Sequence, residues 1–245
     1  MAARLMGVHP PPTKTVTTFI DFDDTLFPTT AWETAYAWEP AGATPLPPLT
    51  AQHASVAAQC DDMAVQFVQA AAKKGPVYIV SNGTYAWVRA ALDAYLPALA
   101  ARLDVCVISA RDVFEAQCVP SQHWKPLMFK ALMRRPQMAS LAYPTGPPQQ
   151  DVIVSVGDRV SDAWAAERLV GDAVLFPFRI PTIRTVVSAK APSFQGTLGQ
   201  WIALLQHKEV LLASAPDTSE WAPVTRWNLQ CPPPTAVGGS SGAPR

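Results

Sequence analysis

The feature that most constrains the fold of this chain is a series of short runs rich in apolar and β-branched residues. Five such runs are typical of β-strands, at 16–20, 77–80, 105–108, 152–156 and 173–176. Runs of four or five apolar residues predict strands that are buried on both faces, as in a parallel sheet. Between them, apolar residues recur at helical spacing in segments such as 51–74, 88–99 and 201–212. The alternation predicts an α/β fold, a three-layer Rossmann-like parallel sheet with helices on both faces.

The length and composition predict one folded domain followed by a tail. A chain of 245 residues corresponds to about one domain at the usual size of roughly 100–200 residues. Residues of the apolar types make up 49 % of the chain, enough for a well-buried core. Segment 215–245 is rich in Pro, Gly and Ser, a composition typical of disordered chain. We therefore expect the folded domain to span 13–214.

Charge and hydropathy exclude several classes of protein. Nineteen Lys and Arg balance nineteen Asp and Glu, which argues against a nucleic-acid binder that relies on a basic surface. No apolar run approaches the ~18 residues that a membrane-spanning helix needs. The N-terminal residues lack the apolar stretch of a secretory signal, and the four cysteines form no CxxC pair. The sequence thus predicts a cytoplasmic protein without nucleic-acid or membrane partners, and makes no prediction of oligomeric state.

Polar side chains follow the first predicted strand at the point where it ends. In parallel α/β sheets, binding sites gather at the carboxyl ends of the strands. Asp21 and Asp23 lie two residues apart there, so on an extended chain their side chains point the same way. Two carboxylates placed in this way could supply a nucleophile and a proton donor, a metal site, or both.

Similar residues follow other predicted strands. Ser81-Asn82-Gly83 offers a hydroxyl and loop N–H groups after the second strand. Asp158 and Asp162 follow the fourth strand and are four residues apart, a spacing that places both on one face of a helix. Lys125 precedes a proline, where a helix can begin, and Lys130 competes with it for the role of site cation.

Together these segments resemble the four motifs of the haloacid dehalogenase (HAD) superfamily. The motifs are Asp-Phe-Asp-Asp-Thr-Leu at 21–26, a strand ending in Ser81, the pair Lys125-Pro126, and Gly-Asp-(three residues)-Asp at 157–162. The resemblance covers about 16–162. It implies a hydrolase of the phosphatase type, because phosphatases and phosphomutases of this superfamily carry an acidic residue at the position of Asp23, whereas its dehalogenases and P-type ATPases do not.

The resemblance also implies a role for each residue. Asp21 would be the nucleophile that forms an aspartyl-phosphate (phosphoaspartate), and Asp23 would be the acid and base. Ser81 and Asn82 would bind the phosphoryl oxygens. Lys125 would neutralise the developing charge.

The resemblance to the HAD superfamily also implies a bound magnesium ion. The implied ligands are the Asp21 carboxylate, the Asp23 main-chain carbonyl and Asp158, with Asp162 ligating or orienting water. Converging carboxylates repel one another, and a hard cation such as Mg²⁺ with oxygen ligands relieves that repulsion. One departure from the family is Asp24, which stands where many members have glycine.

Segment 27–50 is too short for an ordinary cap domain, so the resemblance implies a capless or minimally capped enzyme. Trp32, Tyr36 and Trp38 in this segment form either an apolar wall over the site or packing onto the core. An open site suits a phosphorylated substrate that is either a phosphoprotein or a small metabolite. Two alternatives remain open. One is a catalytically idle scaffold or binding module, and the other is a phosphotransferase or phosphomutase.

Overall fold

The computed structural model describes residues 16–36, 46–102, 105–138, 151–172, 175, 181–188, 193–213 and 224–229. Six strands form one sheet in the order β3-β2-β1-β4-β5-β6, and every neighbouring pair is parallel. The strands are β1 (Val16–Ile20), β2 (Val77–Ser81), β3 (Val105–Ser109), β4 (Val152–Gly157), β5 (Thr182–Ser188) and β6 (Val224–Leu229). The strand order reverses between β1 and β4, the position where ligands bind in open α/β sheets.

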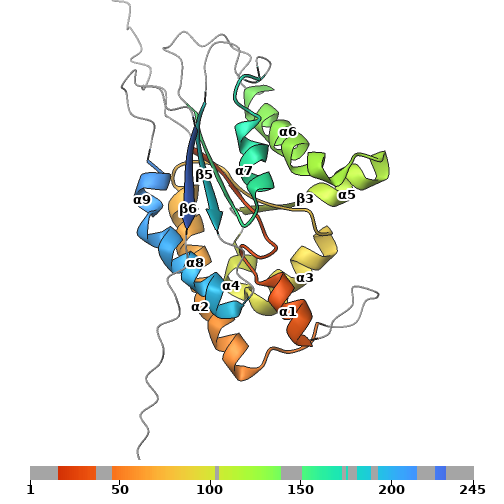
Figure 1. Cartoon of the computed structure of the whole chain (residues 1–245), viewed down its shortest axis with the longest axis vertical. Coiled ribbons are helices and arrows are strands. Elements are labelled where there is room, and N and C mark those ends of the chain that lie inside the picture. The colour runs from red at the N-terminus through yellow and green to blue at the C-terminus, as the bar shows by residue number, and fades with distance from the viewer. Residues whose placement is uncertain are drawn as a thin grey trace, which may run out of the picture.

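Helices connect these strands and cover both faces of the sheet (Figure 1). The α-helices are α1 (Thr29–Tyr36), α2 (Ala51–Ala72), α3 (Tyr85–Tyr95), α4 (Pro97–Ala100), α5 (Ala110–Phe114), α6 (Trp124–Met138), α7 (Val160–Glu167), α8 (Phe194–Gln206) and α9 (Lys208–Leu211). Two short 3-10 helices, η1 (Glu115–Gln117) and η2 (Ser121–His123), precede α6. The predicted three-layer α/β architecture with a parallel sheet is therefore present.

The core consists of two apolar clusters, one on each face of the sheet. Alternate residues of a strand point to opposite faces, so Ile20 packs in the cluster with α2, α3 and α8, whereas Phe19 packs in the cluster with α6 and α7. β4 behaves in the same way, with Val154 facing the first cluster and Ile153 the second. Because β1 and β4 are buried on both faces, their carboxyl ends are held rigidly side by side.

The C-terminal half differs from the sequence-based prediction. The expected strand at 173–176 lies outside the described residues except for Leu175, which is in a turn. The strand beside β4 is instead β5, whose polar sequence TIRTVVS hides it from a search for continuous apolar runs. β6 pairs with β5 from Ile183↔Val224 to Ser188↔Leu229, so the folded domain extends beyond the predicted boundary at residue 214.

Between β1 and α2 the described residues contain one helix, α1, and nine positions (37–45) lie outside the described residues. The buried Trp32 of α1 packs against the rings of Phe27 and Tyr95, with centroids 6.3 and 5.9 Å away. These contacts join α1 to the core. Within the described part of the chain, no helix has the length and apolar character needed to cross a membrane.

Candidate functional site

The site forms where the ends of β1 and β4 meet. Ile20 is in register with Val156, and the N–H of Asp21 donates to the carbonyl of Val156 (2.9 Å). This last backbone bond brings the residue after β1 next to the end of β4. Asp158 follows β4 directly, and the chain then turns into α7, which carries Asp162.

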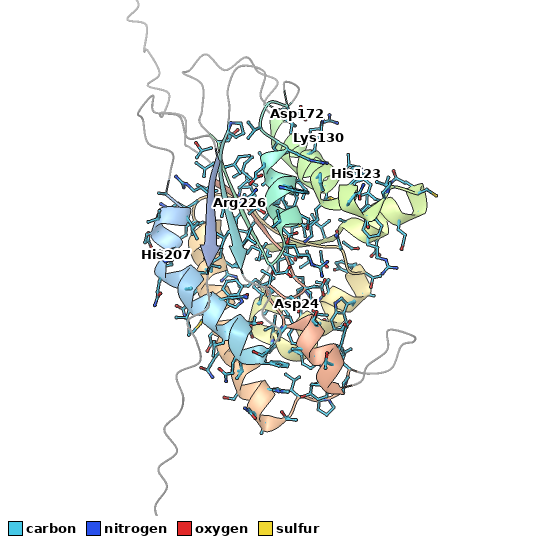
Figure 2. All side chains as sticks on the ribbon, in the orientation of Figure 1. Asp24, His123, Lys130, Asp172, His207 and Arg226 are labelled. Atoms are coloured by element: carbon cyan, nitrogen blue, oxygen red, sulfur yellow. The ribbon has the colours of Figure 1, made fainter. Side chains whose placement is uncertain are left out.

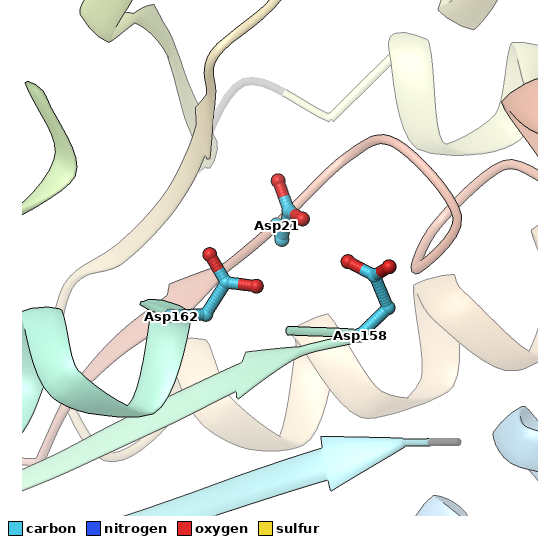
Figure 3. A group of neighbouring side chains, drawn as sticks. All are labelled: Asp21, Asp158 and Asp162. Atoms are coloured by element: carbon cyan, nitrogen blue, oxygen red, sulfur yellow. The ribbon is translucent and has the colours of Figure 1, made fainter. Parts of the chain in front are cut away.

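Three buried carboxylates converge at this point. Asp21, Asp158 and Asp162 each offer an oxygen, and these oxygens all lie within 4.8 Å of one another (Figure 3). Burial raises the pKa of Asp21 well above its ordinary value; Lys125 opposes this effect, and Asp162 and Asp23 add to it. Burial also raises the pKa of Asp158, and the neighbouring Asp162 contributes in the same direction. Burial and mutual repulsion therefore disfavour ionisation of these carboxylates, and a metal ion at the cluster could offset both effects.

Lys125 is the buried cation of the cluster. Its Nζ lies 2.6 Å from Oδ1 of Asp21 and 2.5 Å from Oδ1 of Asp162, so it bridges the segment after β1 and α7. Although burial lowers the pKa of Lys125, the two carboxylates outweigh it and raise the pKa above its ordinary value. The ammonium is therefore charged at neutral pH and leaves the cluster with more carboxylates than cations.

The Asp158 carboxylate is buried and forms an ion pair with Arg159, but it accepts no hydrogen bond from the described residues. Neither of its oxygens has a hydrogen-bond partner among the described residues, although the side chain is almost completely buried. The guanidinium of the exposed Arg159 lies 3.6 Å from Oδ2, too far for a hydrogen bond. Buried carboxylates are normally paired, hydrogen-bonded or bound to a metal. The donor set at Asp158 thus fits a hard cation that takes oxygen ligands.

The absence of a side chain on Gly157 allows the Asp162 carboxylate to pack against the end of β4. A Cβ at this position would lie 2.4 Å from Oδ2 of Asp162, a distance that no real Cβ contact shows. The same carboxylate accepts from the N–H of Arg159 (3.1 Å), which places Asp162 in the first turn of α7. The glycine of the Gly-Asp pair is therefore required by close packing.

Asp23 lies beside this cluster, with a different set of partners. Its Oδ1 accepts from the hydroxyl of Thr29 (2.8 Å) and from the indole N–H of Trp87 (3.0 Å). Its Oδ2 accepts from the hydroxyl of Ser81 (2.8 Å). The negative charge of Asp23 also contributes to the raised pKa of Asp21.

The turn after Asp23 is tight and buried. The carbonyl of Phe22 accepts from the N–H groups of Leu26 (2.9 Å) and Phe27 (3.1 Å), and the side chains of all three are fully buried. Asp24 has a φ of 57°, in the left-handed region that favours glycine and tolerates Asp and Asn. Its carboxylate accepts from the N–H (2.8 Å) and hydroxyl (2.5 Å) of Thr30, so Asp24 joins the turn to α1.

Ser81 ends β2, and the loop that follows is fixed around its hydroxyl. The N–H of Gly83 donates to Oγ of Ser81 (2.7 Å), and the hydroxyl of Ser109, at the end of β3, donates to the carbonyl of Gly83 (2.8 Å). Asn82 is exposed on this loop. The structure thus brings the Ser81 hydroxyl to the Asp23 carboxylate. Asn82 is the next residue in the chain and is exposed to solvent.

The structure separates the two candidate lysines. Lys130 pairs with Asp172 (2.6 Å), and Figure 2 shows this pair well away from Asp24 at the carboxyl end of β1.

The aromatic residues of segment 27–50 were expected either to form a wall over the site or to pack onto the core, and the structure distinguishes these possibilities for two of the three. Trp32 is core, and the hydroxyl of Tyr36 bonds to Nδ1 of His53 at the start of α2 (3.0 Å). Trp38 lies outside the described residues.

Two partners of Asp23 were not anticipated from the sequence. Thr29 is the first residue of α1, and Trp87 lies in the first turn of α3, six positions after Ser81. Thr84 caps α3 by accepting from the N–H of Trp87 (3.2 Å), a Thr-to-N3 bond that is typical of helix starts. The capping signal predicts where α3 begins, but the contact of the indole with Asp23 depends on how α3 packs.

Comparisons with models of protein families, with curated proteins and with solved structures find no match to this chain. The fold and the site geometry are therefore the basis for assigning a function.

Proposed function

We propose that this chain is a Mg²⁺-dependent phosphatase of the HAD type, which hydrolyses a phosphate monoester through an aspartyl-phosphate on Asp21. One observation carries the proposal: side chains from separate segments converge on a buried carboxylate cluster at the reversal point of a parallel sheet. The converging residues are Asp21, Lys125, Asp158 and Asp162, with Asp23 and Ser81 hydrogen-bonded beside them. These are the residues that the four sequence motifs single out, and their convergence supports the proposal.

Asp21 is suited to the role of nucleophile. Its Oδ1 accepts from the N–H of Phe22 (2.8 Å) and contacts Lys125, so one oxygen is fixed and the carboxylate is oriented. Oδ2 is then the oxygen for attack on phosphorus. The Asp21–phosphorus bond forms as the ester oxygen–phosphorus bond breaks, and Lys125 stabilises the negative charge on the phosphoryl group.

Asp23 supplies the proton transfers on both sides of this intermediate. It donates a proton to the departing ester oxygen, and it then takes a proton from the water that attacks phosphorus. The second attack breaks the Asp21–phosphorus bond, releases inorganic phosphate, and restores the carboxylate of Asp21 and the proton on Asp23. The net reaction consumes one water and yields an alcohol and phosphate.

Asp21 and Asp158 would hold the magnesium ion, with Asp162 beside them. The oxygens of Asp158, which have no hydrogen-bond partner among the described residues, support this assignment. When bound, the ion would offset the excess negative charge of the cluster and favour binding of the anionic phosphoryl group.

The strand order alone also occurs in dinucleotide-binding proteins. The loop after β1 argues against that function here, because it reads DFDDTL and lacks the glycines that let a backbone approach a pyrophosphate.

The proposal is tested by hydrolysis of p-nitrophenyl phosphate with and without Mg²⁺. We compare wild type, Asp21→Asn, and the matched control Asp93→Asn, which alters an exposed ion pair with Arg89 on α3. We expect Mg²⁺-dependent turnover that Asp21→Asn lowers by at least about a thousandfold and Asp93→Asn leaves unchanged. Acid quenching and mass spectrometry would locate the phosphoryl group on the peptide that contains Asp21.

Other outcomes favour the alternatives. Transfer to an added alcohol in excess of phosphate release would identify a phosphotransferase. A folded wild type that binds no Mg²⁺ and turns over no phosphate ester would contradict the phosphatase and favour a binding module.

A further inference from the structure

We infer that Trp87 is a positioning residue for Asp23, and that together with Thr29 it fixes Oδ1 so that Oδ2 exchanges protons with the substrate. This inference rests on the proposed phosphatase function and assigns a role to two residues outside its four motifs. The observation behind it is the unequal set of contacts on the two oxygens of Asp23.

The two donors to Oδ1 of Asp23 determine where a proton on Asp23 can lie. The indole N–H of Trp87 can donate a hydrogen bond but cannot accept one. Its bond to Oδ1 (3.0 Å) therefore requires that oxygen to remain an acceptor, without a proton of its own on that side. The Thr29 hydroxyl donates to the same oxygen (2.8 Å). A proton carried by Asp23 is thus directed to Oδ2.

Ser81 is the described partner of Oδ2, to which its hydroxyl donates. In the proposed reaction the Ser81 hydroxyl turns to a phosphoryl oxygen of the substrate, which leaves Oδ2 facing the ester oxygen. Trp87 and Thr29 are then the contacts that still orient Asp23. Without the indole, the carboxylate would rotate more freely about its Cβ–Cγ bond, and fewer encounters would place Oδ2 correctly.

Trp87 is itself held in place by its neighbours. Its ring lies edge-on to Phe22 (centroids 6.4 Å apart) and packs against Trp32 (5.2 Å). The loop before α3 also passes close to the indole, because a Cβ on Gly83 would lie 2.9 Å from Cδ1 of Trp87. An indole held on several sides can orient a carboxylate, whereas a mobile side chain could not.

The test compares two substrates that differ in their need for a proton. The leaving group of an alkyl phosphate is a strongly basic alkoxide, so its departure requires general acid catalysis. The leaving group of p-nitrophenyl phosphate is a weakly basic phenolate, which needs little protonation. We measure kcat/KM, which reports the steps up to leaving-group departure, for wild type, Trp87→Phe and Thr29→Val. Trp201→Phe is the matched control, because it removes an indole N–H bond to the carbonyl of Thr25 (3.1 Å) in the core.

We expect Trp87→Phe to lower kcat/KM for the alkyl phosphate about tenfold more than for p-nitrophenyl phosphate. Thr29→Val should show the same selectivity to a smaller degree, and it serves as the test if Trp87→Phe fails to fold. Trp201→Phe should change both substrates equally. Equal losses for both substrates in Trp87→Phe and Thr29→Val, with an active wild type, would overturn the inference alone. A wild type inactive on both esters would contradict the phosphatase itself, and the inference with it.

A second readout needs neither metal nor turnover. The chain has eight tryptophans, so its indole N–H resonances can be resolved by ¹⁵N NMR, and Trp87→Phe identifies the one from Trp87. Asp23→Ala should move this resonance in the metal-free protein while the Trp201 resonance stays in place. If the Trp87 resonance does not move, the indole does not bond to Asp23 and the inference is wrong.

Discussion

Asp158 illustrates how a single side chain can indicate a function through an energetic cost. Its carboxylate is buried, and neither oxygen has a hydrogen-bond partner among the described residues. An unpartnered buried polar group costs about 1–3 kcal/mol, and more when it is charged. This destabilising group lies at the reversal point of the sheet, where a bound cation would offset its unfavourable free energy.

The first prediction follows from that cost. Asp158→Asn removes the charge with little change in shape, so the metal-free variant should be more stable than the metal-free wild type. A gain of about 1–2 kcal/mol in the free energy of unfolding corresponds to a rise in Tm of roughly 2–8 °C. The variant should also lose the increase in Tm that Mg²⁺ gives to wild type. Thermal unfolding with EDTA or Mg²⁺ measures both effects, and a lower Tm for the metal-free variant would contradict the prediction.

The raised pKa values of Asp21 and Asp158 predict how the effect of Mg²⁺ depends on pH. In the metal-free folded state these groups hold protons that the unfolded chain releases near pH 4, so stability falls as pH rises from about 4 through the raised values. Mg²⁺ competes with those protons and binds better at higher pH. The increase in Tm on adding Mg²⁺ should therefore be larger at about pH 8 than at about pH 5.5. Equal increases at both pH values would argue against these two carboxylates as ligands.

At the scale of elements, the turn between β1 and α1 decides how the site residues are presented. Asp24 performs two functions there that a glycine could not combine. It adopts the left-handed conformation of the turn, and its carboxylate binds the N–H and hydroxyl of Thr30 in the first turn of α1. The adjacent Thr29 then reaches Asp23. The departure from glycine at this position is therefore compatible with the tight turn, and it links α1 to the site.

The second function of Asp24 predicts an order of stabilities. Asp24→Asn keeps a side chain that tolerates positive φ and can accept from Thr30, so it should lie closest to wild type. Asp24→Gly avoids strain but loses both bonds, and Asp24→Ala loses the bonds and adds strain, a total cost of about 2–4 kcal/mol. Urea unfolding should therefore rank the free energies of unfolding as Asn, then Gly, then Ala. A glycine variant as stable as wild type would show that the bonds to Thr30 contribute nothing.

At the scale of the whole molecule, the sheet is completed by a segment that is distant in sequence from the site. β6 pairs with β5 along its full length, and Arg226 of β6 forms an ion pair with Glu167 at the end of α7 (2.6 Å). The buried Arg184 of β5 also donates to the carbonyl of Leu211 at the end of α9 (2.9 Å). These contacts hold β5 between its neighbours and support the side of the sheet that carries β4.

The contribution of β6 can be measured by truncation. A chain of residues 1–214 lacks β6, whereas a chain of residues 1–230 retains it. We expect the shorter chain to have a free energy of unfolding lower by at least about 2 kcal/mol, because the hydrogen bonds between β5 and β6 are lost. Arg226→Ala in the full chain should cost less, up to about 1 kcal/mol, because its ion pair is partly exposed. Equal stability of the two truncated chains would show that β6 adds nothing to the sheet.

The sequence alone determined the strands β1 to β4 and the spacing of the acidic residues that follow β1 and β4. Both are local properties, because an apolar run reports burial and a spacing of two or four residues reports a shared direction. The prediction failed at β5 and β6, where an arginine interrupts the apolar and β-branched residues. The segments TIRTVVS and VTRWNL carry no continuous apolar run, and their pairing with each other depends on the rest of the sheet.

Only the tertiary structure decided which distant side chains meet. Lys125 and Lys130 are alike in sequence, yet α6 places the first against Asp21 and the second against Asp172. The contacts of Trp87 with Asp23 likewise depend on how α3 packs beside the turn after β1. The physical reason is common to both: a side chain's direction follows from its own helix, but its partner follows from the packing of that helix on the sheet.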